Sequence, residues 1–170
     1  MPLEIVRGDL FDAKVDALIH PSNCVATFGG GLSRQFRNRF PEIVLPYQRA
    51  CKSGSIRPGH IHVYDRETDS PRFIISLPTK RHWRDPSKIE DIATGLDALV
   101  DAVAALHIIS VAIPPLGCGL GGLDWLDVEP LITAAAARMD ARVVVYSPDA
   151  SQSRRATDSR KARVRVPKPI

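Results

Sequence analysis

The stretch RFIISLPTKRHWRDPSKIEDIATGLDALVDAVAALHIISVAI, residues 72–113, decides the fold class of this chain. It opens on a run typical of a strand (Arg72–Ser76) and closes on a second apolar run (Ile109–Ile113). Between these runs the apolar residues step by threes and fours along one helical face: Ile89, Ile92, Ala93, Leu96, Leu99, Val100, Val103 and Leu106. We therefore predict a strand, a helix over Lys88–Leu106 and another strand.

The rest of the chain repeats this alternation of short strands with amphipathic helices. We expect further strands at Leu3–Val6, Ala17–His20, His60–Tyr64 and Arg142–Tyr146, and further helices at Leu32–Phe40, Glu42–Lys52 and Val128–Met139. Ser87 and Glu90 predict a capping box at the start of the long helix. A short polar segment joins the strands at His60–Tyr64 and Arg72–Ser76, which predicts an antiparallel hairpin. An α/β fold with a mixed sheet and helices on both faces follows.

Length and composition indicate one soluble globular domain, because the 170 residues are 44% hydrophobic and 25% charged. No apolar run approaches the roughly 20 residues of a membrane span, and MPLEIVRGD lacks an apolar signal core, so we expect a cytoplasmic protein without membrane contact. Three scattered cysteines argue against a disulfide framework or a cysteine-built zinc site. His60 and His62 would share one face of a strand, but no third ligand is evident, and we expect no metal.

The net charge of +4 hides an uneven distribution. Residues 151–170 contain seven Lys or Arg and one Asp, so they carry +6 and leave −2 on residues 1–150. This segment has no aromatic residue and no sustained helical or strand period. We expect a folded domain over 1–148 and a basic, disordered tail over 149–170. The tail could contact nucleic acid phosphates or serve solubility alone.

The unusual loops follow predicted strands. They are HPSNCVATFGGG (20–31), LPTKRHWRDP (77–86), PPLGCGLGGLDW (114–125) and the shorter RGDL (7–10). In α/β sheets, ligands bind beyond the carboxyl ends of the strands. The sequence therefore predicts one site shared by these loops.

Two of these loops are rich in glycine and are expected to open helices, a combination that suits phosphate binding. Neither fits the pattern of a nucleoside triphosphate loop. Gly117, Gly119 and Gly122 match the dinucleotide-binding fingerprint, but in the last strand–helix unit instead of the first, so NAD binding is a minor alternative. Asn23 and Lys80 are the polar side chains expected at a sugar, with Lys80 as a candidate amine nucleophile. A Cys118 nucleophile with His82 as its base is a competing hypothesis.

Together, GDL, SNCVATFGGGLSRQF, LPTKRHWRDPSK and PPLGCGLGGLDW resemble the macrodomain family. Within it they are similar to the DarG-type DNA ADP-ribosyl glycohydrolases, antitoxins that remove ADP-ribose from DNA. The resemblance covers residues 3–147. It implies a three-layer α/β/α macrodomain with a central mixed sheet, which binds ADP-ribose along the sheet edge where these loops lie.

The resemblance also assigns roles. Asp9 would accept from the adenine amino group, Asn23 would orient the distal ribose, Lys80 would be catalytic, and His82 and Trp83 would border the modified base. The implied contacts to ADP-ribose are Asp9, Leu10, Cys24, Gly29, Gly30, Gly31, Leu32, Thr79, Pro115, Leu116, Gly117, Cys118, Gly119, Leu120, Gly121 and Tyr146.

The implied activity is hydrolysis of ADP-ribose from a DNA base, expected to be thymine, with no cofactor. ADP-ribosylated DNA and a cognate DarT-type ADP-ribosyltransferase toxin are the implied partners. Two alternatives remain open: a hydrolase for ADP-ribose on protein Glu or Asp, and a non-catalytic ADP-ribose reader. Acid-selective relatives place an Asp where this chain has Gly121, and the antitoxins usually read Gly-Lys-Gly at 29–31 and Asn-Thr-Val-Asn at 20–23.

Overall fold

The computed structural model describes residues 3–149. Its strands are β1 (Leu3–Val6), β2 (Ala17–Asn23), β3 (His62–Asp65), β4 (Phe73–Lys80), β5 (Ser110–Ile113) and β6 (Arg142–Tyr146). Its α-helices are α1 (Gly31–Arg39), α2 (Val44–Lys52), α3 (Ile89–Ala105) and α4 (Trp125–Ala137), with short 3-10 turns η1 (Leu10–Asp12) and η2 (Pro41–Ile43). The basic tail predicted at 149–170 lies outside the described residues except for Asp149.

The six strands form a single sheet in the order β1-β6-β5-β2-β4-β3. All neighbours pair in parallel except β3, which pairs antiparallel with β4 at one edge. The predicted hairpin and mixed sheet are confirmed. The carboxyl ends of the five parallel strands therefore meet at one edge of the sheet, called the crest below.

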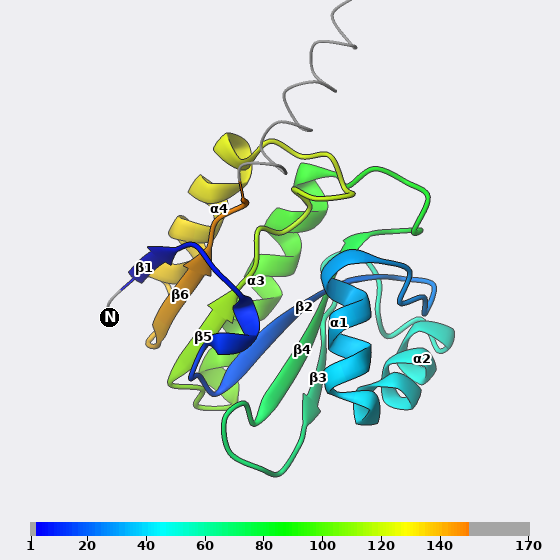
Figure 1. Cartoon of the computed structure of the whole chain (residues 1–170), viewed down its shortest axis with the longest axis horizontal. Helices are drawn as coiled ribbons and strands as arrows, with labels where there is room; N and C mark the ends of the chain where they lie inside the picture. Colours follow the sequence, from blue (N-terminus) through cyan, green and yellow to red (C-terminus); the bar gives the residue numbers. More distant parts are fainter. Residues whose placement is uncertain (1–2, 150–170) are drawn as a thin grey trace, which may run out of the picture.

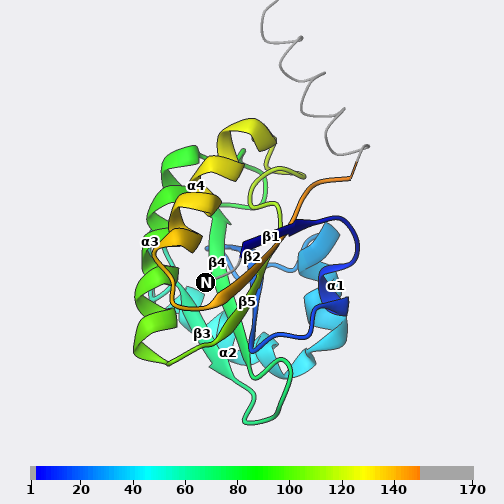
Figure 2. The same cartoon turned by 90° about the vertical axis from the view of Figure 1, so that its left-hand side faces the viewer.

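Helices cover both faces of this sheet, as Figures 1 and 2 show: α3 and α4 pack on one face, and α1 and α2 on the other. Alternate residues of a strand point to opposite faces. In β6, for example, Val143 and Val145 belong to the α3/α4 core, whereas Val144 belongs to the α1/α2 core. The predicted three-layer α/β/α architecture is confirmed.

Two strands are longer than predicted, and both extensions reach the crest. β2 runs on through Pro21 to Asn23, and β4 runs on through Pro78 to Lys80. The sequence predicts strands that end at His20 and Ser76, but the extended backbone of proline is compatible with a strand where its missing N–H is not needed, so both strands continue. Lys80 is consequently the last residue of a strand and does not lie on the following turn.

Two helix starts also differ from the sequence prediction. The capping box is wrong: α3 begins at Ile89, its N-cap is Lys88, and no side chain caps it. α4 begins at Trp125 instead of Val128, because the Asp124 side chain accepts a hydrogen bond from the Leu126 N–H and caps the helix earlier. The acidic first turn of α3 matches the positive end of its dipole.

His60 and His62 do not share a strand face as predicted, since β3 starts only at His62. Among the described residues, no group of three or more metal-ligating side chains occurs. Within residues 3–149, no helix has the length and apolar character needed to cross a membrane.

Candidate functional site

An irregularity in the pairing of β2 with β4 brings the two predicted polar residues together. Ser22 pairs with Pro78, whereas the next residue, Asn23, pairs with Lys80, so Thr79 is an extra residue on β4. A β-bulge of this kind bends the strand and re-aims the side chains that follow it. The Thr79 hydroxyl donates to the Ser22 carbonyl at 3.3 Å and is buried. Asn23 and Lys80 thus end neighbouring strands side by side at the crest.

The Asn23 side chain is held rigidly and is only 7% exposed. Its Oδ1 accepts from the Val25 N–H at 3.0 Å, the Thr27 N–H at 3.3 Å and the Tyr47 hydroxyl at 3.1 Å. Its Nδ2 donates to the Thr27 carbonyl at 2.9 Å. Because these bonds fix which end of the amide is oxygen, the remaining Nδ2 hydrogen is what Asn23 can offer a ligand.

Lys80 is half-buried, and its Nζ donates to the Trp83 carbonyl at 3.3 Å. Burial lowers the pKa of Lys80 from its usual value, and this effect is opposed by the Asp85 carboxylate. A lowered pKa increases the fraction of neutral amine, which is the nucleophilic and proton-accepting form. The environment of Lys80 therefore favours chemistry more than that of a solvated lysine would.

In the loop after β4, Arg81 contacts α3, whereas His82 and Trp83 contact each other. Arg81 turns to α3 and makes a two-point ion pair with Asp91, with nitrogen–oxygen distances of 3.0 and 3.1 Å. Asp91 is buried, so this pair fixes the loop to the helix. His82 and Trp83 stack with ring centroids 5.5 Å apart, and the Arg84 guanidinium lies 4.6 Å from the Trp83 ring centre. Trp83 is 45% exposed, and its carbonyl accepts the hydrogen bond from Lys80.

The two glycine-rich loops lie next to each other. A Cβ placed at Gly30 would sit 3.6 Å from Cδ1 of Leu120, which belongs to the second loop. Gly31 has φ +57° and is the first residue of α1, so glycine is needed there for the chain to enter the helix. The amino end of α1 thus faces the second loop at the crest, an arrangement suited to a phosphate.

The second loop is folded onto itself and onto the segment before α3. The Leu123 N–H donates to the Gly117 carbonyl at 2.9 Å, and the Ser87 N–H donates to the Gly121 carbonyl at 3.0 Å. A Cβ at Gly121 would overlap the Ser87 hydroxyl and the Gly117 carbonyl oxygen. The prediction that this loop opens a helix is confirmed, since α4 begins at Trp125, the last residue of the loop, and the Asp124 side chain accepts from the Leu126 N–H.

Several predicted contacts could reach a ligand only through the main chain. The side chains of Leu10, Leu116 and Cys118 are buried in the two cores. Gly119 and Leu120 are exposed, and Pro115, Cys24 and Leu32 are half-buried near the crest. Burial raises the pKa of the Cys118 thiol to about 12, and its Sγ lies 3.6 Å from the Leu116 carbonyl, so the nucleophile hypothesis for Cys118 loses its basis.

Asp9 and Tyr146 define the other end of the crest. The Asp9 side chain accepts from the Phe11 N–H at 2.9 Å and caps η1, and its other oxygen lies 3.8 Å from Arg39. Tyr146 ends β6 opposite Val6, and burial, with Asp12 and Asp9 nearby, raises its pKa. Asp9 remains exposed enough to accept a hydrogen bond from a ligand.

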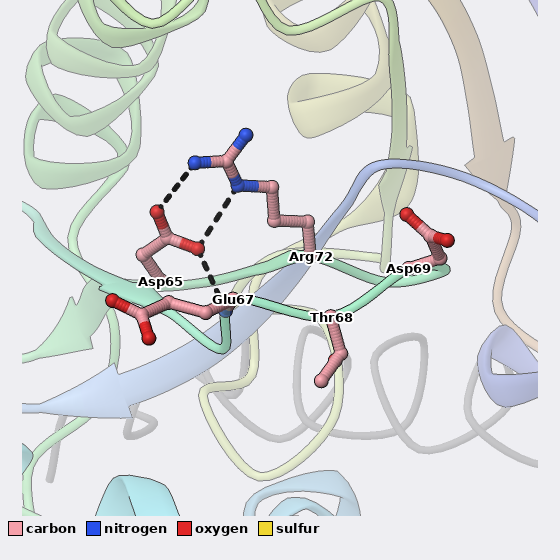
Figure 3. Close-up of a pocket in the computed structure, with 5 residues that line it drawn as sticks. All are labelled: Asp65, Glu67, Thr68, Asp69 and Arg72. Carbon is pink, nitrogen blue, oxygen red and sulfur yellow. Dashed lines mark hydrogen bonds and ion pairs between the residues drawn. The ribbon is translucent and has the colours of Figure 1, made fainter.

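A surface hollow lies far from this site, at the turn between β3 and β4 (Figure 3). Asp65 and Arg72 point toward each other across it and form a two-point ion pair at 3.0 and 2.8 Å. The turn precedes β4, so it lies at the amino end of that strand, opposite Lys80. It brings none of the predicted site residues together.

Sequence reasoning missed three residues that support the site. Tyr47 is fully buried and donates to both the carbonyl and Oδ1 of Asn23. His20 is buried and bridges the Ser76 hydroxyl of β4 at 2.9 Å and the Ser33 hydroxyl of α1 at 2.7 Å. Ser87 lies against the second glycine loop with its hydroxyl buried and unpartnered among the described residues. Of these three residues, only His20 could have been found from the sequence, because it is a polar residue in an otherwise apolar strand.

The dinucleotide-binding alternative does not fit this topology. The fingerprint glycines follow β5, which lies between β6 and β2, whereas that motif normally follows the first strand of a parallel sheet. Pro114 and Pro115 also stand where the tight turn of the motif would be.

The chain is similar in sequence to a known protein family and to named relatives. The family model described as "Macro domain" matches residues 19–132. A protein of Mycobacterium tuberculosis named "DNA ADP-ribosyl glycohydrolase" is 45% identical over 143 residues, which are 83% of this chain and 41% of that protein. This chain therefore spans about two-fifths of the length of that relative.

Two solved structures are similar over nearly the whole described chain. The "Macrodomain of Mycobacterium tuberculosis DarG" has a TM-score of 0.84 and 43% identity, covering 87% of this chain and 99% of that one. "Thermosipho africanus DarTG in complex with ADP-ribose" has a TM-score of 0.82 and 33% identity, covering 86% of this chain and 42% of that one.

Proposed function

This chain belongs to the macrodomain family, and from that premise we propose that it is an ADP-ribosyl glycohydrolase acting on modified DNA bases. The observation that carries the proposal is the pairing of Asn23 with Lys80 through the bulge at Thr79. It sets an amide donor and an amine with a lowered pKa side by side, next to two glycine loops suited to a diphosphate.

The order of the sheet suggests how ADP-ribose would lie. Asp9, after β1, would accept from the adenine amino group. The diphosphate would lie between the amino end of α1 and the loop Gly117–Gly121. The distal ribose would then meet Asn23 on β2, three strand spacings or about 14 Å from β1, and Lys80 on β4, one spacing further. Thr79, Cys24, Leu32, Pro115 and Tyr146 would complete the contacts.

The proposed reaction breaks the bond between C1″ of the distal ribose and the base. Asn23 donates a hydrogen bond to a ribose hydroxyl and holds the sugar in place. Lys80 acts at C1″, either as an amine nucleophile whose adduct water then hydrolyses, or by stabilising the opened ribose as the base departs. The base leaves with a proton, and water supplies the hydroxyl of free ADP-ribose. His82 and Trp83 border the departing base.

DNA is preferred over protein as the carrier of ADP-ribose for two reasons. The M. tuberculosis relative is named for DNA, and this chain resembles it at 45% identity. The Asp of acid-selective relatives would stand at Gly121, where a Cβ overlaps Ser87 and the Gly117 carbonyl. We propose thymine as the base, and a DNA ADP-ribosyltransferase of the DarT type as the enzyme that makes the substrate.

One assay tests the proposal. The protein is incubated in parallel with ADP-ribosylated single-stranded oligonucleotide and with peptide ADP-ribosylated on Glu, and released ADP-ribose is measured. We expect release from the oligonucleotide by the parent protein and none by the Lys80→Ala variant. Faster release from the peptide would show that the protein acts on ADP-ribose attached to protein carboxylates instead of DNA. ADP-ribose binding without release from either substrate would identify the protein as a non-catalytic ADP-ribose reader.

A further inference from the structure

The carboxyl end of α2 lies beside the catalytic pair. Cys51, in the last turn of α2, has its Sγ 3.9 Å from the Asn23 carbonyl, and the Tyr47 hydroxyl donates to that same carbonyl at 2.9 Å. The segment that follows α2 leads to the start of β3 at the crest. A Cβ at Gly59 would lie 3.3 Å from Thr94 of α3, so this segment passes around the β3 edge of the sheet.

This end of the molecule is basic. Between residues 17 and 64 there are six Lys or Arg and one carboxylate, Glu42, and that carboxylate pairs with Arg66. Arg49 and Lys52 in the last turn of α2, and Arg57 beyond it, are exposed. Among the described residues, none of these three has a carboxylate within ion-pair distance.

The opposite helical layer carries the reverse charge. Between residues 88 and 140 there are eight carboxylates and two cations, Lys88 and Arg138. Arg138 is already paired with Asp97. A polyanion that reaches the crest would therefore be attracted to the α2 side and repelled from the α3/α4 side.

An exposed aromatic side chain lies on the loop that follows Lys80. Trp83 is 45% exposed, stacks on His82 and has the Arg84 guanidinium over its ring. An exposed indole beside cations is the usual platform on which an unpaired base stacks, and it does so with little regard to sequence. Paired DNA would keep its bases inside the duplex and could not use it.

From these observations we propose that Arg49, Lys52, Arg57 and Arg84, with Trp83, form a surface that binds the backbone of single-stranded nucleic acid flanking the modified base. This proposal deepens the proposed function and rests on it. With adenine at β1 and the distal ribose at β2 and β4, whatever is attached to C1″ leaves toward β3 and the end of α2. The chain of phosphates would then follow the side chains that are positive and free of carboxylate partners.

The test uses charge reversals in the full 170-residue chain, so that the basic tail is the same in every sample. Arg49→Glu and Lys52→Glu are compared with Lys14→Glu, an exposed lysine before the amino end of β2, opposite the crest. Binding of an unmodified single-stranded oligonucleotide is measured by fluorescence anisotropy across a salt series, and each fold is checked by thermal denaturation.

We expect the two reversals at the basic end to weaken oligonucleotide binding about fivefold or more at low salt, and Lys14→Glu to change it far less. The slope of log K against log salt should become shallower by roughly 0.7 for each lost phosphate contact. Equal effects of all three reversals, or no measurable binding by the parent, would overturn the proposal.

Hydrolysis separates this proposal from the function it rests on. Arg49→Glu and Lys52→Glu should lower kcat/KM for an ADP-ribosylated oligonucleotide and leave that for an ADP-ribosylated nucleoside unchanged, because the nucleoside has no flanking phosphates. If the parent bound oligonucleotide through these residues but released no ADP-ribose from either substrate, the proposed function would fail and the binding surface would stand. An equal loss of kcat/KM on both substrates would mean that the reversals damage Asn23 and Lys80, and the proposed binding surface would be rejected.

Discussion

Asn23 and Lys80 are register partners at the carboxyl ends of parallel strands, and they are level only because Thr79 is an extra residue on β4. Without the bulge, Asn23 would face Thr79, and Lys80 would point to the other face of the sheet, since side chains alternate along a strand. The juxtaposition on which the proposed chemistry depends is thus a property of backbone pairing.

Replacing Lys80 by alanine should lower hydrolysis by about 100-fold or more while ADP-ribose affinity stays within a few-fold. Binding should come mainly from the glycine loops and the adenine end, so removing a group that acts in the transition state lowers kcat. Lys80→Arg should fail too, because a guanidinium stays protonated. Turnover of labelled oligonucleotide and calorimetric titration with ADP-ribose measure the two effects.

The matched control is Lys14→Ala, which removes an exposed lysine at the other end of β2. Arg81, although next in sequence, is unsuitable because its ion pair with buried Asp91 holds the loop to α3. Near-parental turnover by Lys80→Ala would make Lys80 an ordinary surface cation.

Tyr47→Phe should slow hydrolysis more than it weakens ADP-ribose binding. The hydroxyl donates to the carbonyl and Oδ1 of Asn23, so its loss frees the amide to rotate and leaves buried acceptors with one donor fewer. We expect a loss of about 1–2 kcal/mol in the free energy of unfolding. Urea denaturation and kcat measure these effects, with Tyr64→Phe on β3 as the control; identical kinetics in both variants would remove Tyr47 from the mechanism.

Gly121→Ala should destabilise the fold by about 1–3 kcal/mol and weaken ADP-ribose binding, because the new methyl group would overlap Ser87 and the Gly117 carbonyl. Gly30→Ala is the contrast, since a Cβ there meets only Leu120 at ordinary contact distance. Thermal denaturation of both variants gives the comparison. A fully stable Gly121→Ala protein would show that the site accepts a side chain, and the argument against acid-selective chemistry would lapse.

Stability should fall as the pH drops below 6.5, and His20 should be a cause. Burial lowers the pKa of His20 to about 3, so below 6.5 the unfolded chain takes up a proton that the folded protein does not. Between about pH 6 and pH 4 this costs the folded state about 1.4 kcal/mol per pH unit. Urea denaturation across this range should show a shallower slope for His20→Gln than for the parent; parallel slopes would contradict the assignment.

Local patterns were sufficient to predict most elements and their arrangement. The strands at Leu3–Val6 and Arg142–Tyr146 have the predicted bounds, and α3 differs from its prediction by one residue at each end. Apolar periodicity reports which face of an element is buried, and the short polar link at 66–71 reports the hairpin. The crest loops were predicted because glycines and polar residues stood out between apolar runs.

The remaining features depend on contacts between distant residues. The bulge at Thr79 arises from the register of β4 against β2, which no local pattern in LPTK reveals. The spacing of Ser87 and Glu90 predicts a helix cap, but the Ser87 N–H donates to the carbonyl of Gly121, 34 residues later. Tyr47 has the spacing of an ordinary core residue of α2, and its hydrogen bonds to Asn23 exist only because the helix packs under the end of β2.

The separation of charge between the two helical layers also has a kinetic consequence. Cations on the α1/α2 side and carboxylates on the α3/α4 side give the protein an electric dipole across its sheet. The field of a long polyanion exerts a torque on such a dipole and turns the α1/α2 side, with Arg49 and Lys52 at the end of α2, toward the nucleic acid before contact is made. Encounters would then be productive more often than random orientation allows, and salt would reduce this advantage in association rate by screening the field beyond a Debye length, about 10 Å at 0.1 M.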